Sequence, residues 1–140
     1  MEKSIDKDYF EFDIKPGMVS PLSLAYIGDA VYEVFIRSYI MHKENMPVAK
    51  LHKASTRYVS AKAQAEIVKH ISDDFTEEEL SVYKRGRNAH SYTSAKNADI
   101  VDYRMATGLE ALIGYLYIKK DHQRLKMLVE KCIDVINSGE

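Results

Sequence analysis

The sequence predicts an all-α protein of about six or seven helices in a single domain. Three observations support this. Apolar residues recur at spacings of three and four over long segments, no segment alternates as a strand does, and helix start signals stand between the segments. At 140 residues the chain has the usual length of one domain. We expect residues 1–19 to form a partly ordered leader and residues 20–140 to form the helical domain.

The first predicted helix begins with Ser20 as its cap and Pro21 at its first position, where a missing N–H is harmless, and it continues to Met41. Bulky apolar residues recur along it at helical spacing and predict one stripe that faces a core: Leu24, Ile27, Val31, Val34 and Phe35. Gly28 lies inside this helix, where glycine costs about 1 kcal/mol relative to alanine. Its presence therefore predicts the close approach of another helix.

Start and stop signals divide the rest of the chain into five further segments, with helices predicted at residues 47–57, 61–71, 76–87, 99–118 and 121–138. Ser60 is placed to cap the second of these, and Thr76 with Glu79 forms a capping box for the third. Gly139 lies just past the last helix. Residues 88–97 have mostly short, polar side chains and include basic ones, and this composition predicts an exposed loop.

The formal net charge of −1 hides a segregation of charge along the chain. From Lys43 to His70 there are six basic and two acidic residues, and from Asp73 to Glu79 there are five acidic residues and no basic one. From Lys84 to Asn97 there are four basic residues and no acidic one. Two basic stretches separated by an acidic turn predict a basic face on a nearly neutral protein, as in proteins that bind nucleic acids.

Other features exclude several classes of function. Cys132 is the single cysteine and lies in an apolar helix, which favours a packing role and a reduced, cytoplasmic setting. No apolar run has the length of a membrane span, and the first residues are too charged for a signal peptide. The five histidines lack the spacing of zinc ligands. Because no apolar run spans a membrane, we expect no membrane partner. Because no glycine-rich loop follows a strand, we expect no nucleotide cofactor.

Two acidic residues stand in the middle of otherwise apolar helical runs. Asp29 lies in LAYIGDAVYE and Glu110 lies in GLEALIGYLY. Each residue taken alone also has a simpler interpretation, as a solvated carboxylate on a helix surface. Gly114, one turn after Glu110, would let its helix approach the first helix at Gly28. That approach would bring Asp29 and Glu110 together.

The two runs resemble the two motifs of the ribonuclease III endonuclease domain, and the chain as a whole resembles the short Mini-ribonuclease III branch of that family. The resemblance implies that Asp29 and Glu110 are catalytic residues and ligands of a metal ion. Oxygen ligands that leave other positions to water and phosphate suit Mg²⁺, with Mn²⁺ as an alternative ion. Glu33 matches an acidic position of the first motif. We expect Glu33 and Thr107 to lie next to the metal ligands and to orient them, without binding the metal themselves.

The sequence departs from the larger ribonuclease III pattern at three positions. The family usually has an acidic residue where this chain has Ala25, an aspartate where it has Thr107, and a glutamate near Val48. Only two carboxylates of the family's cluster remain, which predicts weaker metal binding and leaves the number of metal ions open.

A third resemblance concerns the basic stretch KRGRNA, which is similar to a stretch of Mini-ribonuclease III whose loop reaches the RNA groove. The resemblance predicts RNA contacts by this stretch and the loop after it: Lys84, Arg85, Arg87, Asn88, His90, Lys96 and Asn97. Lys50, Lys53 and Arg57 form a stripe on another helix and are a second candidate track. The alternative is that these charges complement a helix dipole and stay solvated.

The resemblance implies a homodimer in which Tyr26 packs on the partner, whereas an ordinary position in the protein's own core is the alternative. The expected function is that of a Mg²⁺-dependent endoribonuclease that cleaves double-stranded or structured RNA to 5′-phosphate and 3′-hydroxyl ends. Its expected substrate is the 23S ribosomal RNA precursor, which a ribosomal protein would present. Two other interpretations remain open: a non-catalytic RNA-binding or ribosome-assembly protein on the same fold, and an all-α interaction module.

Overall fold

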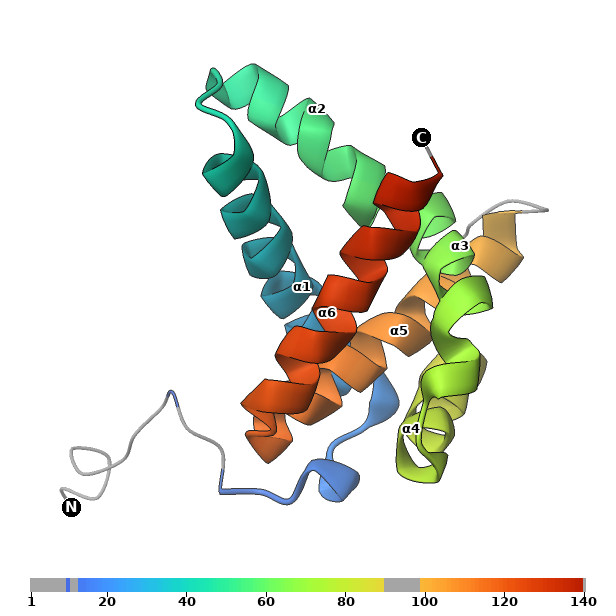
Figure 1. The fold of residues 1–140 in the computed structure, drawn as a ribbon. Coiled ribbons are helices and arrows are strands. Elements are labelled where there is room, and N and C mark those ends of the chain that lie inside the picture. Colours follow the sequence, from blue (N-terminus) through green and yellow to red (C-terminus); the bar gives the residue numbers. More distant parts are fainter. Residues whose placement is uncertain (1–9, 11–12, 90–98, 140) are drawn as a thin grey trace, which may run out of the picture.

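The computed structural model describes residue 10 and residues 13–89 and 99–139, and in this part of the chain every regular element is helical. The elements are η2 (Pro16–Met18), α1 (Pro21–Lys43), α2 (Val48–Val59), α3 (Ala61–Ile71), η3 (Ser72–Asp74), α4 (Glu77–Asn88), α5 (Asp99–Lys119) and α6 (His122–Ser138) (Figure 1). The predicted all-α class is confirmed. None of the described helices is both long and apolar enough to cross a bilayer.

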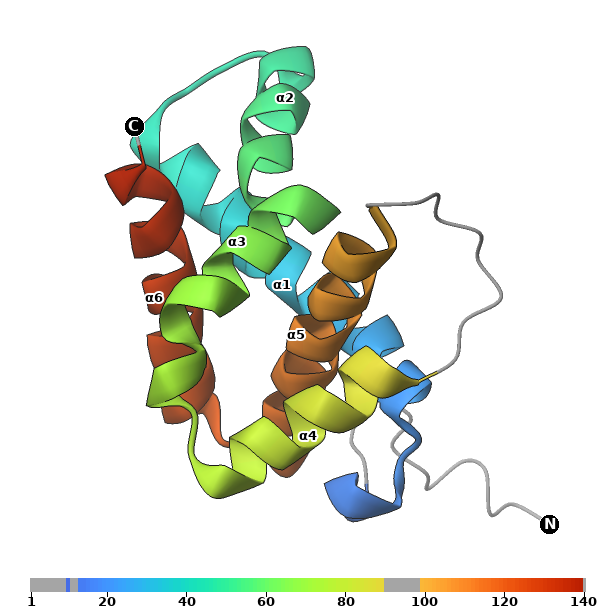
Figure 2. The same ribbon diagram turned by 90° about the vertical axis from the view of Figure 1, so that its right-hand side faces the viewer.

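Helix α5 is the centre of the bundle. It packs against α1, α3 and α4, and it also contacts α6, as the two perpendicular views show (Figures 1 and 2). From Ala106 to Gly114 only Glu110 is not fully buried, so this helix is apolar around almost its whole circumference. A helix that is buried on all sides must be covered by its neighbours. Glu110 therefore lies in the middle of the most enclosed element of the fold.

The predicted helix starts are confirmed by their capping hydrogen bonds. The Ser23 N–H donates to the Ser20 hydroxyl at 3.2 Å. In the capping box, the Glu79 N–H donates to the Thr76 hydroxyl, and the Glu79 carboxylate accepts from the Thr76 N–H at 3.0 Å. At the start of α6, Asp121 is the capping residue. These short-range signals therefore fix where α1, α4 and α6 begin.

The predicted apolar stripe of α1 reaches the core with four of its five residues, but it does not form the centre of the buried face. Of its five residues only Leu24 is fully buried, and Val34 is 64% exposed. The face that α1 turns to the core carries Leu24, Ala25, Gly28, Tyr32, Ile36 and Ile40. The reason is that α5 approaches α1 at its smallest residues, which hydropathy does not rank as core. Ile27, Val31 and Phe35 are partly buried and pack against the edge of the core, whereas Val34 is exposed.

Cys132 lies on the inner face of α6 and is fully buried. Burial raises the pKa of its thiol to about 12, so the side chain stays a neutral thiol. The predicted packing role of this residue is confirmed.

Candidate functional site

The site is built on the crossing of α1 and α5, where two glycines let the backbones touch. A Cβ atom placed on Gly28 would lie 1.8 Å from the backbone oxygen of Glu110, and one placed on Gly114 would lie 2.0 Å from that of Leu24. No side chain fits at such distances. The close approach predicted from Gly28 and Gly114 is confirmed. It sets Asp29 of α1 beside Glu110 of α5.

Asp29 and Glu110 form a pair of interacting acids. Each carboxyl group shifts the pKa of the other, so the two side chains lie close together. Burial is the main cause that raises the pKa of Glu110 to about 7, and the negative charges of Asp29 and Glu33 raise it further. Burial, followed by the charge of Glu33, also raises the pKa of Asp29. The structure thus brings the two predicted acids together, and no basic group of the described residues compensates their negative charge.

Gln64 of α3 holds Glu110 from the other side. Its Nε2 donates to Glu110 Oε2 at 3.1 Å and to the Val59 carbonyl at 3.0 Å. The side chain is 1% exposed, and its Oε1 is buried with no hydrogen-bond partner among the described residues. The sequence reasoning missed this residue. A signal was present, because Gln64 is the one polar member of a buried stripe that continues with Ile67, Val68 and Ile71.

The residues at the crossing fit a hard divalent cation. The donors are the two carboxyl groups, and no basic group among the described residues lowers the pKa of either acid. Oxygen donors with surplus negative charge are what Mg²⁺ prefers. No group of three or more Asp, Glu, His or Cys side chains able to hold a metal occurs among the described residues. Water and phosphate oxygens would therefore complete the coordination.

The two residues predicted to support the acids have other partners. Glu33 accepts a hydrogen bond from Arg37 Nη2 at 2.9 Å and acts on the acid pair through its charge. The Thr107 hydroxyl donates to the Tyr103 carbonyl of its own helix at 2.9 Å, and its backbone oxygen faces Gly86 of α4. Glu33 is thus coupled to the pair electrostatically, whereas Thr107 serves the packing of α4 on α5.

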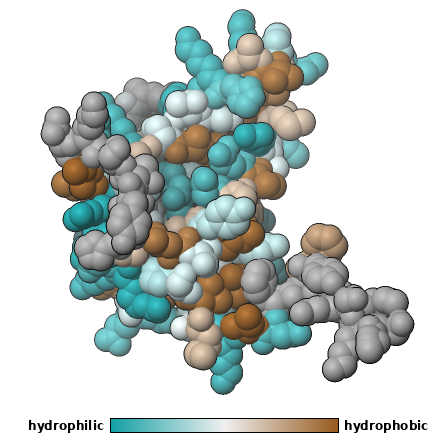
Figure 3. All heavy atoms as spheres, turned by 180° about the vertical axis from the view of Figure 1, so that it is seen from behind, coloured by the Kyte–Doolittle hydropathy of each residue, from teal (hydrophilic) through white to brown (hydrophobic). Residues whose placement is uncertain are grey.

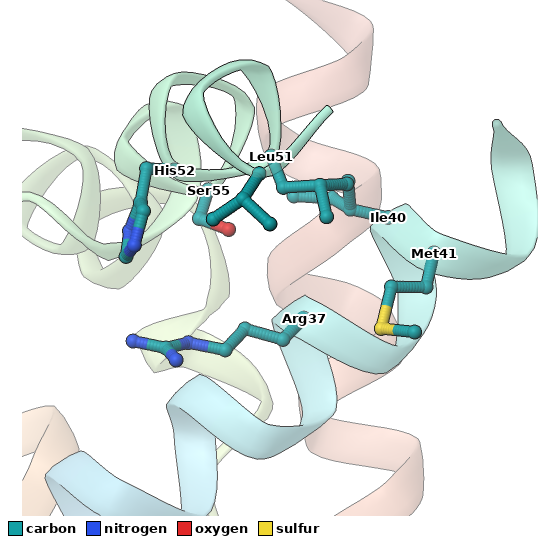
Figure 4. Close-up of a pocket in the computed structure, with 7 residues that line it drawn as sticks. Arg37, Ile40, Met41, Leu51, His52 and Ser55 are labelled. Atoms are coloured by element: carbon teal, nitrogen blue, oxygen red, sulfur yellow. The ribbon is translucent and has the colours of Figure 1, made fainter. Parts of the chain in front are cut away.

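A small pocket between α1 and α2 carries two basic side chains. Its volume is about 160 Å³, and its lining residues include Arg37 and His52. Figure 4 shows the Arg37 guanidinium and the His52 ring on the same side of this pocket. Asp29, Glu33 and Arg37 follow one another at a spacing of four, so they share one face of α1. The sequence reasoning missed Arg37, although its spacing from Glu33 was visible.

The predicted basic stretch lies at the end of α4. Lys84, Arg85 and Asn88 are exposed and line a shallow hollow on this helix. Arg87 donates from Nε to Asn88 Oδ1 at 3.1 Å, and its guanidinium lies over the Tyr83 ring. The other predicted RNA contacts, His90, Lys96 and Asn97, lie outside the described residues.

The second predicted track runs along α2, where Lys50 and Lys53 are exposed. Arg57 lies against α6, with its Nη2 donating to the Ile136 carbonyl at 3.5 Å and its guanidinium 5.3 Å from the centre of the Tyr58 ring. Of the three residues, Arg57 therefore also takes part in the packing of α2 on α6.

Comparison with known proteins agrees with this geometry. The family model of the ribonuclease III domain matches residues 22–121. The chain belongs to the ribonuclease III family. Relatives named Mini-ribonuclease 3 occur in Clostridium tetani, with 48% identity over 97% of this chain and 93% of the relative, and in Thermoanaerobacter, with 51% identity over 84% and 83%. The relative of the same name in Staphylococcus aureus is 45% identical over 86% of this chain and 91% of its own.

A solved structure shows the same fold. The crystal structure of a protein from Fusobacterium nucleatum superimposes with a TM-score of 0.74 at 32% identity, over 84% of this chain and 93% of that one. The resemblance inferred from the two acidic motifs is confirmed, and so is the enzyme class: the protein is an endoribonuclease.

Proposed function

We propose that this endoribonuclease hydrolyses double-stranded or structured RNA at a Mg²⁺ ion bound by Asp29 and Glu110, and leaves 5′-phosphate and 3′-hydroxyl ends. The observation that carries the proposal is the uncompensated acid pair at the α1–α5 crossing. Two acids that repel each other in a partly buried site are costly unless a cation binds there.

The protein's part in the reaction is to bind and to orient. When bound, Mg²⁺ (or Mn²⁺) supplies positive charge for the scissile phosphate and makes water more acidic. Asp29 and Glu110 fix the position of that charge, and the Gly28–Gly114 contact keeps the two side chains on rigid helices. No nucleophilic side chain and no covalent protein intermediate are needed.

Basic groups on α1, α2 and α4 offer binding positions for the RNA backbone. Lys84, Arg85 and Arg87 lie near the end of α4. Arg37 follows Glu33 on the face of α1 that carries Asp29, and His52 of α2 lines the same pocket as Arg37. Double-stranded RNA is recognised mainly through its shape, its phosphates and its 2′-hydroxyl groups. We therefore assign these side chains to the phosphate backbone, without a role in base reading.

We also propose that the enzyme is a homodimer through the outer face of α1. Tyr26 is 84% exposed, so the alternative that it belongs to the protein's own core is wrong. Val34 lines an apolar groove of about 430 Å³ together with Ile27, Val31, Phe35 and Leu125. Figure 3 shows that apolar side chains also reach the surface on the face opposite to the view of Figure 1. A two-fold dimer would offer one acid pair to each strand of a duplex.

The dimer is tested with Val34→Glu, which places a charge in the groove. We expect this variant to sediment as a monomer at concentrations where the wild-type protein is a dimer, with its helical circular dichroism retained. Val101→Glu is the matched control, because Val101 is 60% exposed but lies on α5 outside the groove. A Val34→Glu protein that stays dimeric would place the interface elsewhere.

For the substrate we propose the 23S ribosomal RNA precursor in the cytoplasm, with a ribosomal protein presenting it. The support is the similarity to the Mini-ribonuclease 3 relatives and a free, buried Cys132, which suits a reducing compartment. Mapping of the 5′ ends of stable RNAs in cells that lack the protein tests this. Unchanged ends of the 23S RNA would remove it as the substrate.

The catalytic proposal is tested with Asp29→Asn and Glu110→Gln on a labelled RNA duplex with Mg²⁺. We expect each to lower the cleavage rate by about 100-fold or more, equivalent to about 2.7 kcal/mol, because a charge on the cation site is lost. Duplex binding in EDTA should be retained. Asp134→Asn, an exposed acid on α6, is the control and should cleave normally.

Two outcomes would contradict the proposal. If the wild-type protein binds duplex RNA but never cleaves it at any Mg²⁺ concentration, the non-catalytic RNA-binding alternative holds. If both variants cleave at the wild-type rate, the acids of the site lie elsewhere in the chain.

A further inference from the structure

Gln64 is an unusual residue for its position. It stands on the buried face of α3, between apolar neighbours, with 1% of its surface exposed. Its Nε2 makes two hydrogen bonds, to Glu110 Oε2 at 3.1 Å and to the Val59 carbonyl at 3.0 Å. The amide thus links the α2–α3 corner to the acid in the middle of α5.

The orientation of this amide follows from its partners. The Val59 carbonyl can only accept a hydrogen bond, so the nitrogen of Gln64 must face it. A flipped amide would put two oxygens against each other. Glu110 Oε2 therefore receives a true N–H donor, which holds the carboxyl group in one orientation. A carboxylate accepts at several lone pairs, so the remaining ones stay available to another ligand.

The arrangement is costly for stability alone. The Oε1 of Gln64 is buried with no hydrogen-bond partner among the described residues. An unsatisfied buried polar atom lowers stability, and a leucine or methionine of similar volume would avoid it. A role in packing does not explain why an amide stands here.

The chemistry of the donor suggests the role. A lysine or arginine at this position would also hold Glu110, but it would neutralise the charge permanently and compete with a cation. A neutral amide fixes the carboxyl group and leaves its charge available.

We infer that Gln64 is a positioning residue that orients Glu110 toward the divalent cation without neutralising it, an inference that rests on the proposed metal role of Glu110. Residues that orient metal ligands typically change metal affinity by about 10- to 100-fold when they are mutated.

The test compares Mn²⁺ binding, measured by electron paramagnetic resonance, in the wild-type protein and in Gln64→Leu. We expect Mn²⁺ to bind Gln64→Leu about 10-fold or more weakly. We expect its cleavage rate to recover in part as the Mg²⁺ concentration is raised, and duplex binding in EDTA to be unchanged. Gln64→Met is the second variant if Gln64→Leu does not fold. Ile67→Val is the matched control, because Ile67 is fully buried on the same face of α3. It should lower the melting temperature slightly and leave Mn²⁺ affinity unchanged.

The outcomes separate this inference from the proposed function. If the wild-type protein binds Mn²⁺ and Gln64→Leu and Gln64→Met bind it equally well, Gln64 has no positioning role and the inference is wrong. If Mn²⁺ binding is absent from the wild type, or is unaffected by Glu110→Gln, the metal role of Glu110 itself fails. A loss of affinity shared by Ile67→Val would show a general packing effect and would also overturn the inference.

Discussion

Two glutamates inside the bundle are held in opposite ways. Glu79 of α4 is 4% exposed and accepts hydrogen bonds from Arg124 Nε at 2.7 Å and from Arg124 Nη2 at 2.8 Å. Its charge is matched by a fixed cation that joins α4 to α6. Glu110 of α5 receives a hydrogen bond from a neutral amide and has a second acid, Asp29, as its neighbour.

The pKa values of Glu79 and Glu110 differ because their neighbouring groups carry different charges. Burial alone would raise the pKa of Glu79, but the hydrogen bonds from Arg124 and from the Thr76 backbone lower it below its ordinary value. Burial raises the pKa of Glu110 to about 7, and in the part of the chain that the structure describes no basic group lowers it. The same side chain is thus a structural link where the fold supplies the counter-charge. Glu110 has no such partner among the described residues and is therefore a candidate ligand for a dissociable cation.

The largest expected effect comes from removal of the fixed counter-charge. Arg124→Met leaves Glu79 buried and unpaired, so we expect the free energy of unfolding to fall by about 3–5 kcal/mol. Urea denaturation at neutral pH measures it. Lys131→Met is the matched control, because Lys131 lies on α6 like Arg124 but forms an exposed ion pair with Asp74. Loss of that pair should cost less than about 1 kcal/mol. Equal, small losses in the two variants would show that Glu79 is not stabilised by its partner.

A smaller effect is expected from Glu110, and it depends on pH. An unfolded glutamate has a pKa of 4.5, and the folded value is raised to about 7. The stability that Glu110 contributes is therefore fully present below pH 4.5 and is lost as the pH rises through 7. In EDTA at pH 8, Glu110→Gln should be more stable than the wild type, by an amount on the order of 3 kcal/mol, and at pH 4 the two should be equal.

The controls for this experiment use both glutamates. The pKa of Glu79 is lowered, so its contribution is present above the unfolded value and is lost as the pH falls through the folded value. Glu79→Gln should therefore lose its destabilisation in acid. Addition of Mg²⁺ at pH 8 should raise the stability of the wild type and leave Glu110→Gln unchanged. A wild-type protein whose stability relative to Glu110→Gln does not change with pH would contradict the uncompensated state of Glu110.

Local signals in the sequence were sufficient for much of the fold. The caps at Ser20, Thr76 and Asp121 act over three or four residues, so they can be recognised without a structure. The glycines at the crossing were also informative, because a glycine inside a helix has a cost that calls for an explanation. The stripe on α1 was predicted only in part, since hydropathy reports that Val34 is apolar and does not report whether another helix covers it.

By itself the sequence determined the helices, the two acids and the glycines that bring them together. Only the tertiary structure decided that Glu110 is enclosed, that Gln64 holds it, and that Arg124 neutralises Glu79 while no basic group of the described residues is paired with Glu110. The physical reason is range. Helix caps and periodicity act between residues a few positions apart, whereas burial and charge compensation depend on side chains that are 45 or 46 residues apart in the chain and meet only after the helices pack.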